Sequence, residues 1–262
     1  VTSQWLDGQK VVQIDIDPEE IGRGYENTMR VEGDAKMTME NLLTALAAKT
    51  SAQEDNSAAI NAQQTQRDND IIKVEPQKDL REAVRKGIPE DGILISGMTQ
   101  LGYYSRAHFP VYEPRTFITS SYSGNLGYAY PTALGAKVAQ PDKAVVCLSG
   151  DGGFMFNAQE LATAVRHNIA VVVIVFSDNA YGNVARIQKE KYAGRQIASD
   201  LQNPSFTDFA KSFGVMALKA EGPDALENAL NQALDANAPA LIEVPVGEMP
   251  SPWDFVLLPK VR

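Results

Sequence analysis

Residues 144–183 read AVVCLSGDGGFMFNAQELATAVRHNIAVVVIVFSDNAYGN. Two apolar runs rich in β-branched residues, at 144–149 and 169–177, flank a stretch at 158–167 whose apolar residues have helical spacing. A strand, a helix and a second strand in this order place both strands parallel in one sheet that is buried on both faces. The stretch therefore predicts a doubly wound α/β domain, with helices on both faces of a mostly parallel sheet.

The same alternation continues on both sides of this stretch. The sequence predicts further strands at residues 92–96, 116–119, 214–220 and 240–246, and helices at 77–85, 128–139, 206–213 and 224–235. These elements define one domain at residues 71–262. Ligands of such sheets bind beyond the carboxyl ends of the strands, so the residues at those ends carry the functional argument.

The N-terminal part of the chain lacks this alternation. A strand is expected at 10–16 and a helix at 33–49, with Asp34 as its N-cap. Because this is too little for an independent domain, residues 1–50 are predicted to be the tail of a preceding α/β domain, and the chain a piece of a longer protein. Residues 51–70 are rich in Ser, Ala, Gln, Asn and Asp, which predicts an exposed linker.

Composition excludes several classes of protein. The hydrophobic fraction of 44% and charged fraction of 22% are typical of a soluble globular chain. The net charge is −9 and Lys and Arg are scattered, which argues against binding nucleic acid. A single cysteine, Cys147, suits a reducing cytosol, and no run approaches the roughly 18 apolar residues of a membrane span. We therefore expect a cytoplasmic protein with neither nucleic acid nor membrane as partner.

The turn after the first strand of the opening stretch contains Gly150, Asp151, Gly152 and Gly153. Glycines let backbone N–H groups approach a phosphate, and the start of the following helix also favours an anion. A carboxylate in the middle of the turn would repel a bare diphosphate, so a cation between the two is expected. Taken alone, such a turn is more often structural than functional.

A second polar loop, Ser177 to Asn183, follows the second strand. The intervening residues have the length of one helix and one strand, so neighbouring parallel strands would bring Asp178 close to Asp151. Two carboxylates, one loop carbonyl and diphosphate oxygens would fill the octahedral shell of Mg²⁺ at about 2.1 Å. The spacing of the two loops is therefore more specific than either loop alone.

This pair of loops resembles the motif of thiamine-diphosphate-dependent enzymes of the acetolactate synthase, pyruvate decarboxylase and benzoylformate decarboxylase family. That motif is GDG followed, after a similar interval, by Asn-Asn, where this chain has Ser177 and Asp178. Asp178 keeps the ligating oxygen of the second Asn and adds a charge. The resemblance covers residues 71–262 and implies Mg²⁺ ligands at Asp151, Asp178 and the carbonyl of Ala180.

Further stretches extend the resemblance to the cofactor. Residues 123–131 (SGNLGYAYP) are similar to the segment whose apolar residue wedges between the two cofactor rings, which implies that role for Leu126 as the catalytic residue. The Gly124 carbonyl would meet the 4′-amino group. The cofactor-binding residues that the resemblance implies are Gln100, Leu101, Gly124, Leu126, Gly150, Asp151, Gly152, Gly153, Tyr181, Gly182 and Asn183.

The resemblance also concerns segments outside this domain. Residues 10–22 and 31–36 are similar to the end of the family's Rossmann-like middle domain, which in some members binds FAD, although too little of it is present to infer FAD here. In the family, an N-terminal pyrimidine-binding domain of a partner subunit supplies a glutamate. No segment here resembles it, which implies a missing N-terminal half and a homodimer or homotetramer as the complete enzyme.

The implied activity is that of an acetolactate-synthase-like decarboxylase or carboligase of 2-keto acids. Acetolactate synthases have a Trp that shapes the site of the second keto acid, and Ile187 occupies that position, which counts against a strict biosynthetic acetolactate synthase. A carbon–carbon lyase of the same family and a degenerate, non-catalytic homologue remain alternatives. An ordinary nucleotide-binding Rossmann domain would need a GxGxxG pattern that the sequence lacks.

Overall fold

The computed structural model describes residues 10–24, 28–47, 49, 55–71, 74–120 and 123–251, which fall into two compact units divided between Arg67 and Asp68. In the first unit, β1 (Val11–Asp15) pairs in parallel with β2 (Thr28–Glu32), followed by α1 (Ala35–Ala47). The Asp34 carboxylate accepts the backbone N–H of Met37 at 2.9 Å and caps α1 as predicted. Strand β2 was not predicted.

The predicted linker contains a helix, α2 (Ser57–Ile71). Its side chains at 57–66 are exposed, consistent with the low apolar content of the segment. Alanine and glutamine nevertheless favour a helix, and this propensity explains why a segment without an apolar face is not irregular. The assignment of residues 1–50 to a middle domain stays a prediction.

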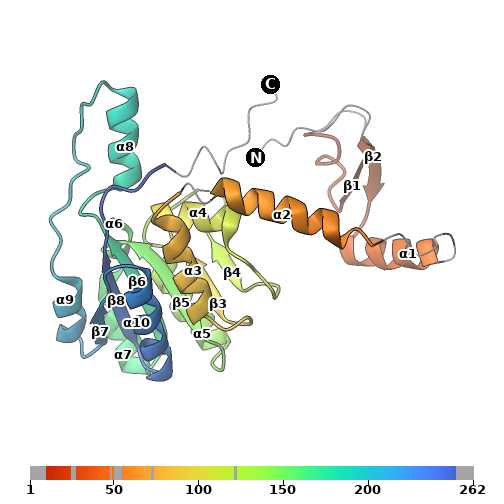
Figure 1. The fold of residues 1–262 in the computed structure, drawn as a ribbon. Coiled ribbons are helices and arrows are strands. Elements are labelled where there is room, and N and C mark those ends of the chain that lie inside the picture. Colours follow the sequence, from red (N-terminus) through yellow and green to blue (C-terminus); the bar gives the residue numbers. More distant parts are fainter. Residues whose placement is uncertain are drawn as a thin grey trace. The chain divides into compact units, whose positions relative to one another are not determined.

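The second unit is built on a six-stranded sheet in the order β4-β3-β5-β6-β8-β7, in which every strand pair is parallel. The strands are β3 (Ile93–Ser96), β4 (Phe117–Thr119), β5 (Val145–Gly150), β6 (Val171–Ser177), β7 (Met216–Lys219) and β8 (Ala240–Pro245). After β4 the chain returns across β3 to form β5, so the strand order reverses between β3 and β5. The predicted fold class is confirmed (Figure 1).

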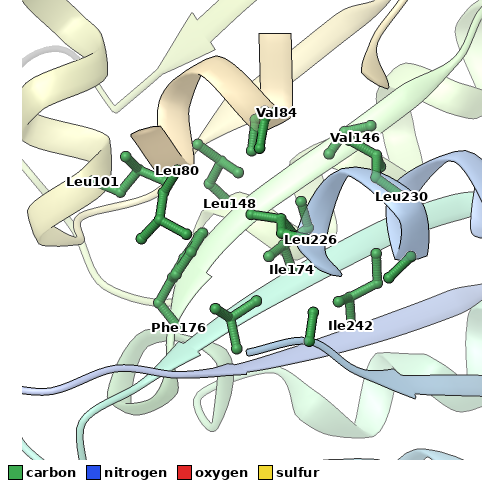
Figure 2. Packing of buried hydrophobic residues seen from close by; sticks show 14 of the residues in the cluster. Leu80, Val84, Leu101, Val146, Leu148, Ile174, Phe176, Leu226, Leu230 and Ile242 are labelled. Carbon is green, nitrogen blue, oxygen red and sulfur yellow. The ribbon is translucent and has the colours of Figure 1, made fainter. Parts of the chain in front are cut away.

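Helices cover both faces of this sheet. Helices α3 (Gln77–Gly87), α4 (Gln100–His108) and α10 (Pro223–Asp235) pack on one face, and α5 (Ala129–Ala139), α7 (Leu161–His167) and α9 (Phe206–Ser212) on the other. Alternate strand residues point to opposite faces, as Val146 and Cys147 do. Figure 2 shows the first core, where Leu148 and Ile174 lie with Leu80 of α3 and Leu226 of α10. Each such buried side chain contributes about 1.5–3 kcal/mol.

The segment after β5 differs from the expected turn. The chain becomes helical at once, in the four-residue α6 (Asp151–Phe154), and a 3₁₀-helix (Ala158–Glu160) then leads into α7. Gly150 is therefore the N-cap of a short helix, and Asp151 is its first residue. Gln100 and Leu101, assigned to the cofactor by the resemblance, begin α4. Both segments bring a helix N-terminus to the carboxyl edge of the sheet.

Candidate functional site

A cavity of about 260 Å³ lies at the carboxyl edge of the sheet, where the strand order reverses. The segments that follow β3, β5, β6 and β8 line it, together with the segment before α5. Every residue that the sequence analysis assigned to cofactor or metal lines this one cavity: Gln100, Leu101, Gly124, Leu126, Gly150, Asp151, Gly152, Gly153, Asp178, Ala180, Tyr181, Gly182 and Asn183.

Sequence reasoning missed part of the lining. The additional residues are Met98, Thr99, Tyr103, Phe176, Val184, Val246 and Met249. Val246 and Met249 follow β8, the neighbour of β6 on the side away from β5. The rule that ligands bind beyond the carboxyl ends of parallel strands would have pointed to this segment as well.

Asp151 is held firmly by hydrogen bonds. It is only 2% exposed. Its Oδ2 atom accepts the Asn179 backbone N–H at 2.7 Å and the Asn203 side-chain amide at 2.8 Å, with the Ser177 hydroxyl more distant at 3.5 Å. Its Oδ1 atom accepts the Gly152 N–H at 2.7 Å. Burial raises the pKa of Asp151, whereas these hydrogen bonds lower it.

Asp178 is held less firmly. Its Oδ1 atom accepts the backbone N–H of Ala180 at 3.1 Å. Burial, followed by the nearby negative charge of Asp151, raises the pKa of Asp178 from 3.8 to about 6. Two carboxylates that disfavour each other's charge are typical of a cation site. Because the described residues include no group of three or more His, Cys, Asp and Glu able to hold a metal, a cation here would also need carbonyl or ligand oxygens.

Two glycines of these segments are closely packed against neighbouring side chains. A Cβ added at Gly152 would lie 2.5 Å from the Cε1 atom of Tyr181, and one at Gly182 would lie 2.7 Å from the Oδ2 atom of Asp178. Both distances are too short for a side chain without movement of the neighbour. Gly152 therefore lets the segment after β5 pack directly against the Tyr181 ring, and Gly182 leaves room for the Asp178 carboxylate of its own loop.

Two longer helices begin at the cavity. Thr99 caps α4, since its hydroxyl accepts the Gly102 N–H at 3.1 Å, and Gln100 begins the helix at the cavity wall. Helix α8 (Gly182–Lys191) begins with Gly182 and Asn183 in the same wall. Helix N-termini carry partial positive charge, so this wall favours an anionic ligand group.

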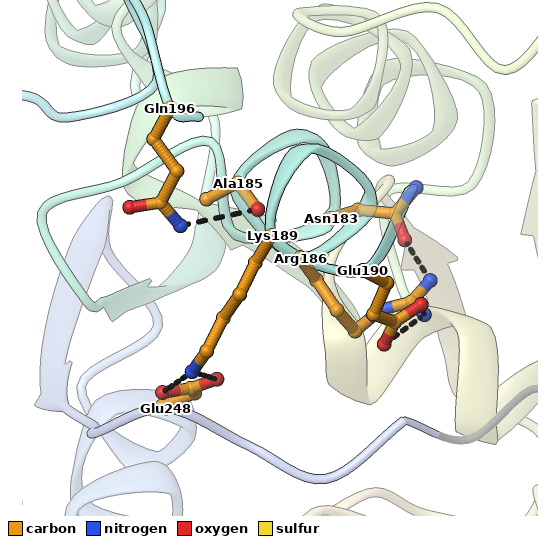
Figure 3. Close-up of polar contacts among 7 residues, drawn as sticks. All are labelled: Asn183, Ala185, Arg186, Lys189, Glu190, Gln196 and Glu248. Atoms are coloured by element: carbon orange, nitrogen blue, oxygen red, sulfur yellow. Dashed lines mark hydrogen bonds and ion pairs between the residues drawn. The ribbon is translucent and has the colours of Figure 1, made fainter. Parts of the chain in front are cut away.

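Helix α8 is held by polar contacts and has no buried residue (Figure 3). Arg186 donates to the Glu190 carboxylate at 3.0 Å and to the Asn183 Oδ1 atom at 2.9 Å. The Lys189 ammonium lies 3.1 Å from Glu248, and the Gln196 amide donates to the Ala185 carbonyl at 3.2 Å. Exposed contacts of this kind stabilise little individually, so α8 is held without the buried apolar side chains that anchor α4.

Leu126 reaches the cavity from the segment before α5. It is 39% exposed, and its Cδ2 atom would lie 3.8 Å from a Cβ on Gly153. Gly124 has a φ of +61°, and Gly127 a φ of +79°, so the backbone on both sides of Leu126 uses the left-handed region. The side chain is therefore presented into the cavity from a tight turn.

The fold and this cavity together define the class: a parallel, doubly wound α/β domain with a carboxylate-containing cavity at the switch point of its strand order. Residues 97–244 match the family described as thiamine pyrophosphate enzyme, C-terminal TPP binding domain. The chain belongs to this family, which confirms the resemblance drawn from the sequence.

Individual relatives carry related names. The chain is 32% identical over 253 residues to a probable acetolactate synthase large subunit of Methanococcus aeolicus, covering 89% of this chain and 42% of that protein. It is 33% identical to an acetolactate synthase large subunit of Haemophilus influenzae (91% and 43% covered) and 44% identical to an acetolactate synthase of Bacillus subtilis (53% and 24%). The chain thus spans less than half the length of these relatives.

No helix among the described residues is both long and apolar enough to cross a bilayer.

Proposed function

We propose that the cavity binds thiamine diphosphate, with the diphosphate at the starts of α4 and α8 and a Mg²⁺ ion held by Asp151, Asp178 and the Ala180 carbonyl. The observation that carries this proposal is the meeting of all these residues in one cavity of a domain that belongs to a thiamine pyrophosphate family. They come from separate segments of the chain, so their meeting does not follow from the sequence motif alone.

The chemistry of the residues fits a cation–diphosphate pair. Carboxylate and carbonyl oxygens are the ligands that Mg²⁺ prefers. Asp178, whose pKa is raised to about 6 by burial and by Asp151, gains a compensating charge when a divalent ion is bound. The two closely packed glycines and the two helix N-termini suit a diphosphate, because a phosphate is bound by backbone N–H groups that approach it closely.

When bound, the cofactor supplies an electron sink at the carbonyl carbon of a 2-keto acid. The chain's own residues bind and orient it. By the resemblance, the Leu126 side chain would separate the two cofactor rings, and the Gly124 carbonyl would accept a hydrogen bond from the aminopyrimidine. Both residues line the same cavity as the three proposed metal ligands.

For the complete protein we propose an acetolactate-synthase-like decarboxylase or carboligase of 2-keto acids, working in the cytoplasm. The names of its relatives support this activity. The chain covers about 42% of these relatives, which supports a further, N-terminal portion of the complete protein. By the resemblance, that portion is the pyrimidine-binding half, and the complete enzyme is a homodimer or homotetramer.

The proposal is tested by titrating thiamine diphosphate into the full chain with Mg²⁺ and with EDTA, followed by calorimetry. Binding should be at least about tenfold tighter with Mg²⁺, because ion and anion neutralise each other. Equal affinity in the two conditions would exclude the metal-bridged site. A turnover assay with pyruvate, after addition of a pyrimidine-binding half, separates an active enzyme from a non-catalytic homologue.

Leu126→Ala tests the ring-separating role in the same reconstituted protein. We expect turnover to fall about tenfold or more while cofactor affinity changes little, because the contact enforces a reactive geometry and not retention. Phe156→Ala, at an exposed residue near Gly127, is the control. Normal turnover of the Leu126 variant would show that this segment has another role.

A further inference from the structure

Asn203 makes the one side-chain amide contact to Asp151 within the described part of the chain. Its Nδ2 atom lies 2.8 Å from the Asp151 Oδ2 atom and 3.2 Å from the Asn179 Oδ1 atom. Both of these atoms are acceptors, so the amide nitrogen and not its oxygen must face them. The orientation of the Asn203 side chain is therefore defined.

The backbone around Asn203 is fixed to the loop after β6. Ala180 and Asp200 form an antiparallel bridge, the Tyr181 N–H donates to Ser199 at 2.8 Å, and the Leu201 N–H donates to Asn179 at 2.7 Å. On its other side, Pro204 disfavours a helical conformation at Asn203. Asn203 therefore follows directly on a segment, residues 199–201, that is hydrogen-bonded to the loop after β6.

The hydrogen bonds to Asp151 distinguish its two oxygens. Oδ2 faces two close donors, Asn179 and Asn203, which occupy both of its lone pairs, and the more distant Ser177 hydroxyl at 3.5 Å. Oδ1 accepts one hydrogen bond in the described structure, from Gly152, and retains one lone pair. A cation at Asp151 is therefore restricted to one oxygen.

We propose that Asn203 is a positioning residue that keeps Asp151 a one-oxygen ligand and thereby selects Mg²⁺ over Ca²⁺. Mg²⁺ requires near-ideal octahedral geometry, whereas Ca²⁺ accepts carboxylates through both oxygens and in irregular shells. Removing the Asn203 donor frees a lone pair on Oδ2 and allows two-oxygen binding. The inference rests on the proposed function, because it presumes a cation at Asp151.

The experiment compares Asn203→Ala and Asn203→Leu, which both remove the amide donor, with Gln202→Ala, the exposed neighbour, in the full chain. Thiamine diphosphate is held at saturation while Mg²⁺ or Ca²⁺ is titrated by calorimetry, and thermal melting shows which variants are folded. We expect Mg²⁺ affinity to fall about tenfold in both Asn203 variants, the usual effect of losing a partner of a metal ligand. Ca²⁺ affinity should hold or rise, so the Mg²⁺/Ca²⁺ preference falls about tenfold, and Gln202→Ala should match wild type.

An unchanged Mg²⁺/Ca²⁺ preference in either folded Asn203 variant would overturn the inference, as would an equal loss in Gln202→Ala. The test separates the two proposals. If the wild-type chain shows no metal-dependent binding, the proposed function fails and this inference with it. If the wild type binds Mg²⁺ and the variants keep its preference, only the role of Asn203 is wrong.

Discussion

Strands β5 and β6 are each followed directly by an aspartate at the same cavity, yet the two segments are built differently. Asp151 begins a helix, is 2% exposed and accepts two close hydrogen bonds on one oxygen. Asp178 accepts one from Ala180, has a pKa raised to about 6, and leads into a helix with no buried residue. The difference suggests a division between an anchored ligand and an adjustable one.

The largest expected effect is that of Asp151→Ala. We expect affinity for thiamine diphosphate in Mg²⁺ to fall by at least about 100-fold, because the variant loses a proposed metal ligand. Loss of a residue that only supports such a ligand already lowers metal affinity about 10–100-fold. Calorimetric titration of the full chain measures it. Asp178→Ala should lower this affinity less than Asp151→Ala does, because the Asp178 carboxylate is held by fewer hydrogen bonds than the Asp151 carboxylate. Equal losses in the two variants would remove the distinction between the loops.

The next effect is steric. Gly152→Ala puts a Cβ against the Tyr181 ring, at 2.5 Å from its Cε1 atom, so the ring or the loop must move. Overpacking of this kind costs about 1–3 kcal/mol in the free energy of unfolding. Gly153→Ala is the matched control, because the nearest atom to its Cβ, the Ser149 hydroxyl oxygen, lies at 3.4 Å. Denaturant melts that do not distinguish the two variants would show that the loop yields easily.

The raised pKa of Asp178 predicts that replacing this carboxylate stabilises the chain, whereas Gly152→Ala destabilises it. The folded-state pKa, about 6, lies above 3.8, so the folded chain binds the proton more tightly than the unfolded chain. Stability is therefore lost as pH rises between these values, and stays lower above them. Asp178→Asn should stabilise the metal-free chain at pH 7.5 by on the order of 1 kcal/mol, a figure discounted for partial solvent access.

Thermal melts in EDTA at pH 7.5 and pH 4.5 measure this gain, which should shrink at the lower pH. Asp208→Asn is the control of opposite sign, since hydrogen bonds from Ser205 and Lys211 lower the pKa of that carboxyl. A gain at Asp178 that does not change with pH would have to come from packing and not from charge.

The smallest expected effect concerns the salt bridge between Lys189 and Glu248, whose side chains are 58% and 77% exposed. A double-mutant cycle with Lys189→Ala and Glu248→Ala should give a coupling below about 0.5 kcal/mol in the free energy of unfolding. Larger coupling would mean that α8 is more firmly attached than its exposure indicates, which would narrow the contrast between the two loops.

Much of the fold and the site could be predicted because the information is local. The strand–GDG–helix–strand stretch contains its own periodicity and its own polar loops, so both Asp151 and Asp178 could be placed at one sheet edge. Helix α2 was missed because an exposed helix has no apolar periodicity to detect. Asn203 was missed for another reason: its contact to Asp151 spans 52 positions and depends on the bridge between Ala180 and Asp200.

The reversal of strand order between β3 and β5 has a consequence for folding. The cavity joins segments after β3, β5, β6 and β8, which meet only once the central strands have paired. A half-formed sheet therefore offers a ligand no complete site. Because the ligand binds only the fully formed domain, its binding free energy stabilises the domain as a whole. At a free concentration of 100 times Kd this linkage stabilises the folded domain by about 2.7 kcal/mol, and the stabilisation applies to the central strands as much as to the loops.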